Sequence, residues 1–158
     1  MKLYHGSYIA VEKPDLKFSR KRMDFGKGFY VTPIKSQAKH WAKRFLKNNG
    51  SAVVSTYNFT LDANNIKTLQ FTEHNTKWLR FIVACRKGKP VDTEWDLIVG
   101  GVANDKVFNT IQLFWNDIIG EREAIKRLRF NKPNIQYCFK KQALVDNYLL
   151  FIKSEDVK

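Results

Sequence analysis

The stretch that decides the fold reads Asp-Phe-Gly-Lys-Gly-Phe-Tyr-Val-Thr at residues 24–32, and it follows a Leu-Tyr-His-Gly-Ser stretch at residues 3–7. In the later stretch two glycines punctuate a turn, and the β-prone residues after them predict a strand over residues 28–32. The earlier stretch predicts another strand over residues 2–6. His5 lies in the earlier predicted strand and Tyr30 in the later one.

Helical periodicity begins directly after these strands. A helix is predicted to start near Pro33 and to end near Gly50, because apolar residues recur along one of its faces: Ala38, Trp41, Ala42 and Phe45. The remaining predicted elements are helices over residues 73–87, 105–119 and 121–129, a single helical turn over 140–146, strands over 52–61, 96–102, 135–139 and 148–153, and a loop over 11–27. Since these elements do not alternate as regular βαβ units, we expect an α+β domain rather than a doubly wound sheet.

The composition fits one domain spanning residues 1–158. The chain is 44% hydrophobic, which supplies a sizeable core, and no run approaches the ~20 apolar residues of a membrane span. Its start lacks the pattern of a signal peptide. Cys85 and Cys138 lie far apart in the sequence, and Cys85 falls in the apolar pattern of a helix. We therefore expect a cytoplasmic protein with reduced thiols and no membrane association.

Positive charge is the second informative feature of the composition. The formal net charge is +13, from 28 Lys and Arg against 15 Asp and Glu. Such an excess attracts polyanions, although it also serves solubility. The basic residues concentrate at residues 17–27, on the outer face of the helix over 35–47, and over 122–141, where they are Arg122, Lys126, Arg127, Arg129, Lys132, Lys140 and Lys141. This distribution suits a nucleic acid or an acidic protein as partner, and the phosphates of a dinucleotide would account for part of the excess.

Several other catalytic schemes do not fit the sequence. His40 and His74 have no companions at metal-ligand spacing, which argues against a zinc site. The Gly-Lys-Gly at residues 26–28 is too short for a phosphate-binding P-loop, and no Gly-x-Gly-x-x-Gly occurs, so neither a P-loop site nor a Rossmann dehydrogenase is indicated.

The two opening stretches resemble the His-Gly-Ser and Phe-Gly-Lys-Gly-Ile-Tyr motifs of the poly(ADP-ribose) polymerase branch of the ADP-ribosyltransferase superfamily. The resemblance implies a split-sheet fold with an NAD-binding cleft and cleavage of the bond between nicotinamide and ribose. It implies that His5 contacts a ribose hydroxyl, that backbone groups of Gly6 pair with the carboxamide, and that Tyr30 stacks on the nicotinamide. Trp41, eleven residues after Tyr30, stands where that branch has a second stacking aromatic. The motif positions also include Ser7, Phe25 and Gly28 as cofactor contacts.

The likeness extends over most of the chain. The sequence is also similar to a family of small bacterial proteins in which the same motifs precede an Ala-x-x-x-Ala helix and an Asp-Ile-Ile-x-Gly-Pro-Val-Ala-Asp-Asp segment. Residues 96–105 read Asp-Leu-Ile-Val-Gly-Gly-Val-Ala-Asn-Asp, with Gly101 in place of the proline. Bacterial relatives of this kind are often toxins, so the resemblance also implies a cognate antitoxin as partner.

The third catalytic motif departs from the polymerase pattern. That branch carries a glutamate at the start of a late strand, and here Gln136 stands in its place. A glutamine can position a ribose hydroxyl, but it supplies no negative charge and no general base. We therefore expect mono-ADP-ribosyl transfer rather than chain elongation, with Asp24 or Asp105 as the carboxylate suited to activate an acceptor. The alternative is an inactive NAD-, ADP-ribose- or RNA-binding module, and a third option is a basic nucleic-acid-binding protein with coincidental motifs.

Each candidate also has a structural interpretation. Trp41 and Tyr30 could belong to the core, and Ser7 could simply end a strand. Asp105 could cap the following helix. The remaining structural readings are a surface position for His5, an ordinary strand position for Gln136, and turn positions for Gly26 and Gly28.

Overall fold

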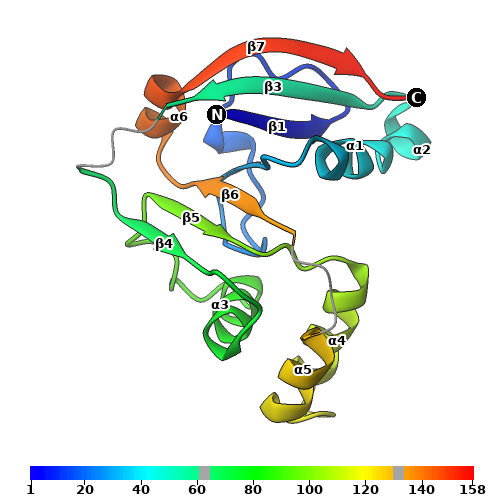
Figure 1. Ribbon diagram of the computed structural model, residues 1–158, viewed down its shortest axis with the longest axis vertical. Coiled ribbons are helices and arrows are strands. Elements are labelled where there is room, and N and C mark those ends of the chain that lie inside the picture. The colour runs from blue at the N-terminus through cyan, green and yellow to red at the C-terminus, as the bar shows by residue number, and fades with distance from the viewer. Residues whose placement is uncertain (61–64, 130–133) are drawn as a thin grey trace.

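Two β-sheets form the centre of the computed structural model, which describes residues 1–60, 65–129 and 134–158 (Figure 1). The first sheet has the strand order β1-β3-β7, with β1 (Lys2–Ser7), β3 (Val53–Phe59) and β7 (Leu149–Asp156). The second has the order β2-β6-β5-β4, with β2 (Phe29–Val31), β6 (Gln136–Phe139), β5 (Leu97–Gly100) and β4 (Thr68–Gln70). Among the described strands only β4 and β5 pair in parallel, and α3 (Thr76–Arg86) connects them.

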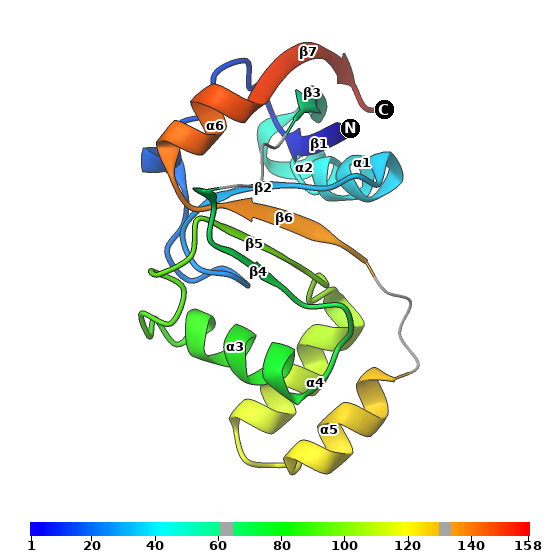
Figure 2. The same cartoon turned by 60° about the vertical axis from the view of Figure 1, so that its left-hand side comes forward.

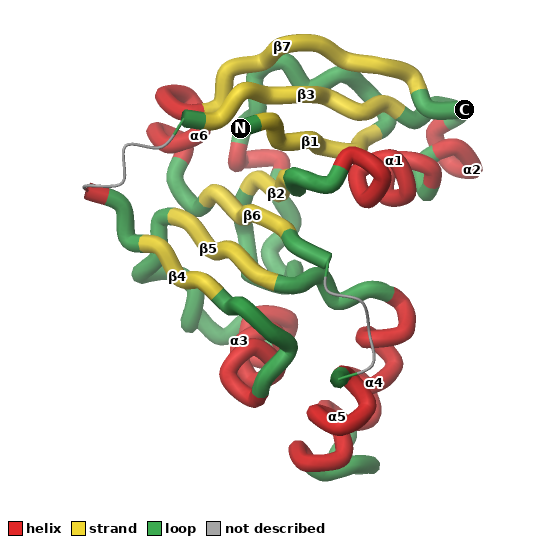
Figure 3. The backbone as a smooth tube through the Cα atoms, viewed as in Figure 1, coloured by secondary structure: helices red, strands yellow, loops and turns green. Residues whose placement is uncertain are grey.

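The two sheets meet where β1 passes β2. The backbone N–H of Tyr4 donates to the carbonyl of Thr32 at 2.8 Å, and the N–H of Thr32 donates back at 2.9 Å. Beyond this bridge the strands separate into their own sheets, as the tube in Figure 3 shows. The junction places β2 between β1 and β6, although β6 lies more than 100 residues from the other two strands in the sequence.

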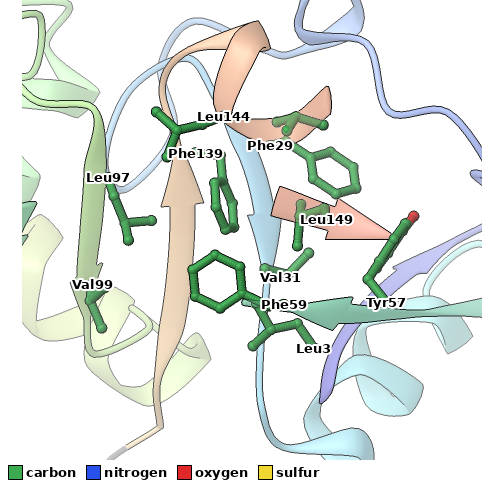
Figure 4. Close-up of a cluster of buried hydrophobic side chains, with 11 residues drawn as sticks. Leu3, Phe29, Val31, Tyr57, Phe59, Leu97, Val99, Phe139, Leu144 and Leu149 are labelled. Atoms are coloured by element: carbon green, nitrogen blue, oxygen red, sulfur yellow. The ribbon is translucent and has the colours of Figure 1, made fainter. Parts of the chain in front are cut away.

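The core shared by the two sheets is aromatic and aliphatic (Figure 4). Phe59 of the first sheet meets Phe139 of the second edge to face, with ring centroids 5.3 Å apart, and Phe29 meets Tyr57 in the same way at 5.8 Å. Successive side chains of a strand point to opposite faces of its sheet. Every second residue of β2 and β6 therefore faces the shared core: Phe29, Val31, Tyr137 and Phe139. Burial of these rings is the main force that holds the sheets together.

A second core lies between the four-stranded sheet and three helices (Figure 2). These helices are α3, α4 (Asp105–Trp115) and α5 (Glu121–Leu128). Trp78 and Ile111 from the helices are fully buried there against Ile98 and Cys138 of the sheet. The remaining described helices are η1 (Leu16–Phe18), α1 (Lys35–Lys43), α2 (Leu46–Asn49) and α6 (Gln142–Tyr148).

The prediction of an α+β chain is confirmed, and several boundaries are corrected. The helix expected from Pro33 to Gly50 is divided into α1 and α2, and Gly50 ends it with φ of 71°. The helix expected to begin at residue 73 starts at Thr76, because the Asn75 side chain accepts from the Trp78 N–H at 3.0 Å and caps it.

Other boundaries shift in the later part of the chain. The helix expected to end at residue 119 ends at Trp115, before Asp117 at φ 57°. The predicted turn at 140–146 is the full helix α6, which includes Tyr148, and the loop over 11–27 contains η1. Strand β4 was not predicted, and Leu61 and Lys132 lie outside the described residues.

Candidate functional site

His5 and Tyr30 lie on adjacent strands and are hydrogen-bonded to each other. His5 Nδ1 lies 2.7 Å from the backbone carbonyl of Tyr30, and the imidazole packs on Phe29 with centroids 4.5 Å apart. A carbonyl only accepts, so Nδ1 carries the proton and Nε2 keeps a lone pair. Burial lowers the pKa of His5, more than the hydrogen bond raises it. A neutral imidazole with an acceptor nitrogen can take a hydrogen bond from a hydroxyl group.

Gly6 allows α1 to approach β1 closely. A Cβ at position 6 would lie 2.3 Å from the Ala38 carbonyl oxygen and 2.9 Å from the Ala42 nitrogen. Both alanines are buried, so the Ala-x-x-x-Ala spacing is a backbone-to-backbone contact surface. In the antiparallel ladder the backbone groups of Gly6 point the same way as those of Tyr4, toward β2 rather than β3. Gly6 therefore faces the junction with a donor and an acceptor side by side.

The turn at residues 24–28 is held from inside by Lys140. Its ammonium donates to the carbonyl of Phe25 at 2.7 Å, to the carbonyl of Lys27, and to Asp92 Oδ2 at 2.7 Å. The side chain of Lys140 is only 6% exposed. Lys140 is therefore a buried residue that stabilises the turn, and its prediction as part of a basic surface was wrong. Gly26, at φ 74°, leaves no room for a side chain beside Asp92.

Tyr30 closes the same turn through its phenol. The hydroxyl donates to the Gly26 carbonyl at 2.5 Å and accepts from the Phe25 N–H at 3.0 Å. Burial raises the pKa of Tyr30 well above its ordinary value, so the phenol stays protonated. The ring is half-buried, and its position is fixed by these two bonds.

Gln136 belongs to a buried polar network with Asp24. The Gln136 amide nitrogen lies 3.0 Å from Asp24 Oδ2 and 3.3 Å from the Gly101 carbonyl. Asp24 also accepts from two nitrogens of Arg86 and from the Ala103 N–H at 3.0 Å. These four donors fill the acceptor positions of the carboxylate, so Asp24 does not fit the role of a general base for an acceptor.

Trp41 lies on the surface and not in the core. It is 38% exposed, and the guanidinium of Arg44 lies 4.4 Å from the centre of its ring. Arg44 in turn contacts Asp105 at 3.3 Å, whose side chain is 88% exposed. The core interpretation of Trp41 is thus excluded. Asp105 is not the helix cap either, because the Asn104 side chain accepts from the Val107 N–H.

Three of the predicted cofactor contacts, Phe25, Gly28 and Ser7, lie in largely buried positions. Phe25 is fully buried beside Phe71 and Phe81, so its side chain has no surface to offer a cofactor. Gly28 has both backbone groups bonded to the Ser19 hydroxyl at 2.8 Å, and a Cβ there would lie 2.4 Å from the Cys138 sulfur. Ser7 is 8% exposed and its hydroxyl has no partner among the described residues. Of the three, only Ser7 retains an available polar group.

Three residues to which the sequence assigned no catalytic or cofactor role complete the candidate site. Arg86 and Lys140 reach Asp24 and the 24–28 turn from distant elements. His74 stacks on Trp78 with centroids 4.1 Å apart, and its buried Nε2 has no partner in the described structure. Burial also lowers the pKa of His74. No local pattern marks Arg86 or Lys140, because their partners lie at least 48 residues away in the sequence.

Two cavities are formed by described residues, and one of them shares Arg86 with the Asp24 network. One, of about 290 Å³, is lined by two arginines, two aromatic rings and two amides: Arg22, Arg86, Phe108, Gln112, Trp115 and Asn116. The other, of about 570 Å³, has Lys39, His40, Lys43 and Lys158 in its wall. His5, Tyr30 and Gln136 line neither cavity. No cluster of three metal-ligating side chains occurs in the described ranges.

Several charges of the predicted basic surfaces are paired. Lys35 and Lys39 both contact Glu155, at 2.8 and 3.2 Å, and lower its pKa. Arg127 contacts Glu123 at 3.0 Å. The thiols of Cys85 and Cys138 are free and buried, and burial raises the pKa of each to about 12, so neither is a nucleophile.

The comparison with protein families gives one match. A family model described as "Protein of unknown function (DUF3990)" matches residues 1–151. The chain belongs to this family. The DUF3990 match includes β1, β2, α1 and β6, so every candidate site residue lies inside it. No curated protein and no solved structure matches the chain. Among the described helices none has the length and apolar character needed to cross a membrane.

Proposed function

We propose that this protein is an NAD-dependent mono-ADP-ribosyltransferase and that its two-sheet core is of the ADP-ribosyltransferase type. The observation that carries the proposal is that the strands bearing the three motifs are neighbours: His5 lies on β1, Tyr30 on β2 and Gln136 on β6, and β2 pairs with β6 and bridges to β1. His5 Nδ1 contacts the Tyr30 carbonyl, and Gln136 and Tyr30 lie on the same face of the second sheet.

The proposed reaction breaks the bond between C1′ of the ribose and the nicotinamide nitrogen. A nucleophilic atom of the acceptor bonds to C1′, its proton passes to solvent, and nicotinamide leaves. Neutral His5 accepts from a ribose hydroxyl, and the backbone N–H and carbonyl of Gly6 pair with the carboxamide. Trp41, exposed on α1, stacks on the nicotinamide. Asp105 is the carboxylate that remains available to an acceptor.

The smaller cavity supports a nucleic acid as the acceptor. It shares Arg86 with the Asp24 network, so it adjoins the proposed reaction site. Arg22 forms no ion pair with a described residue, and the rings of Phe108 and Trp115 lie in the same wall. Guanidinium groups beside aromatic rings bind phosphates and unstacked bases. The lysines around the larger cavity suit an acidic protein, which is the chemistry proposed for an antitoxin.

The test is transfer of label from NAD. The purified protein is incubated with adenylate-labelled NAD and with lysate treated by nuclease or by protease, and nicotinamide release is measured in parallel. We expect nicotinamide release and a labelled product in lysate. Nuclease treatment of the lysate should remove the acceptor and so prevent labelling. His5→Ala should abolish both, whereas His40→Ala, an exposed histidine on α1, should change neither. Absence of both signals in the native protein would refute the transferase.

Acceptor binding has its own control pair. Arg22→Glu should weaken binding of a labelled single-stranded oligonucleotide, whereas Arg20→Glu, two residues away and exposed, should weaken it less. If protease rather than nuclease removes the acceptor, the acceptor is a protein and the nucleic-acid assignment fails.

A binding module without chemistry is the second candidate. The observation that favours it is the occupied Asp24 carboxylate beside a neutral Gln136, which leaves no negative charge directed at the ribose. Calorimetry with NAD separates the two functions, because tight binding without nicotinamide release supports the module. In that case His5→Ala should weaken NAD binding and abolish no reaction.

A further inference from the structure

Gln136 and Asp24 form a buried pair whose geometry fixes one amide orientation. The two residues are 8% and 7% exposed. The Gln136 amide nitrogen faces Asp24 Oδ2 at 3.0 Å and the Gly101 carbonyl at 3.3 Å, and both of these groups can only accept. The nitrogen must therefore lie on this side, and Oε1 on the other. No described residue donates to Oε1.

We propose that Asp24 is a positioning residue that holds the Gln136 amide so that Oε1 accepts a hydrogen bond from a ribose hydroxyl of NAD. The ribose in this inference rests on the proposed function, whereas the orientation of the amide does not. Asp24 does not touch the substrate, because its oxygens are occupied by Arg86, the Ala103 N–H and Gln136.

The same geometry explains the residue type at position 136. A glutamate there would set a second carboxylate against Asp24 and against the carbonyl of Gly101, with no donor between them. Two carboxylates at contact distance do not both ionise, so one of them would hold a proton near neutral pH. The Asp24 charge therefore makes glutamine, not glutamate, the compatible side chain.

Unfolding of four proteins tests the orientation without any ligand. The set is the native chain, Asp24→Asn, Gln136→Glu and the double variant, with Asp117→Asn as an exposed carboxylate control. At pH 8 we expect Asp24→Asn to lower the midpoint of thermal unfolding in the native background and to raise it in the Gln136→Glu background. Relative to the native chain, Gln136→Glu should gain stability from pH 8 to pH 5, because its buried carboxyl binds a proton that the unfolded chain does not.

NAD binding tests the role of the oriented oxygen. By calorimetry, Gln136→Ala and Asp24→Asn should each weaken NAD binding by roughly three- to tenfold, the effect of one hydrogen bond, and Asp117→Asn should leave it unchanged. In turnover assays, substitution of a positioning residue should raise KM or lower kcat by more than the change in the unfolding midpoint accounts for. Each comparison uses the full chain.

The outcomes separate this inference from the proposed function. If Asp24→Asn lowers the unfolding midpoint equally in both backgrounds, Asp24 does not hold Gln136 and the inference is wrong, whatever NAD does. If Asp24→Asn lowers the midpoint in the native background and raises it in the Gln136→Glu background, the amide orientation holds. If the native protein then neither binds NAD nor releases nicotinamide, the proposed function fails and the ribose contact fails with it. If NAD binds natively and Asp24→Asn binds it equally well, only the positioning role is overturned.

Discussion

The two walls of the candidate site are built in opposite ways. On one side, β1 and α1 meet through Gly6 and two alanines, and the contact contains no charge. On the other side, the 24–28 turn is held by two ion pairs, Lys140 with Asp92 and Arg86 with Asp24. The first wall depends on shape and the second on electrostatics. Substitution and pH should therefore affect the two walls differently.

Loss of the Lys140 ammonium is expected to have the largest effect. Lys140→Met leaves Asp92 and the carbonyls of the turn buried without their donor, so the free energy of unfolding should fall by about 3–5 kcal/mol. Urea denaturation measures it. Lys141→Met, at the adjacent exposed lysine, should change it by about 0.5 kcal/mol or less. If the two variants lose the same free energy of unfolding, Lys140 does not stabilise the turn.

Breaking the uncharged wall should cost less. Gly6→Ala places a methyl group 2.3 Å from the Ala38 carbonyl, and α1 must move to admit it, at about 1–3 kcal/mol of unfolding free energy. The matched control is Gly120→Ala, since nothing lies within 4 Å of its added Cβ; it should cost under about 1 kcal/mol. The loss at Gly6 should be insensitive to salt. A salt-dependent loss would mean that charge, not shape, holds this wall.

The histidines near the junction predict a pH dependence of stability. Burial lowers the pKa values of His5 and His74 below the ordinary 6.5, so the unfolded chain binds more protons as the pH falls through this value. The free energy of unfolding should therefore decline from pH 7 to pH 5, by at most about 1.4 kcal/mol per pH unit for each histidine. Urea titrations at several pH values measure the slope.

Histidine variants identify the source of that slope. His5→Gln and His74→Gln should each flatten it, and His40→Gln should not. The pKa of Glu155 is lowered, so this carboxylate titrates below the window. An unchanged slope in the double His5→Gln and His74→Gln variant would contradict the assignment.

Local sequence patterns predicted the parts of the site that are contiguous. The glycine turn, β2 and the helix after it follow from periodicity and turn chemistry, whereas the stacking role of the exposed Trp41 stays a prediction. The same patterns misplaced Lys140, which looks like one more residue of a basic run. Its partners are Asp92 and the backbone of a turn more than 110 residues away, so only the folded chain reveals the pairing. Phe25 was likewise a motif residue whose ring proves to belong to the core.

Trp41 should show the smallest effect on stability and a clear effect on ligand binding. Its ring is 38% exposed and contacts Arg44, so Trp41→Ala should lower the unfolding free energy by only about 0.5–1 kcal/mol. Stacking on nicotinamide would make NAD binding roughly tenfold weaker in Trp41→Ala, whereas Trp41→Phe keeps a ring and should retain most of the affinity. Calorimetry and urea denaturation on the same three proteins separate the two quantities. If Trp41→Ala binds NAD as tightly as the native chain, the uncharged wall supports the fold alone, and recognition of the nicotinamide must come from the charged wall and Tyr30.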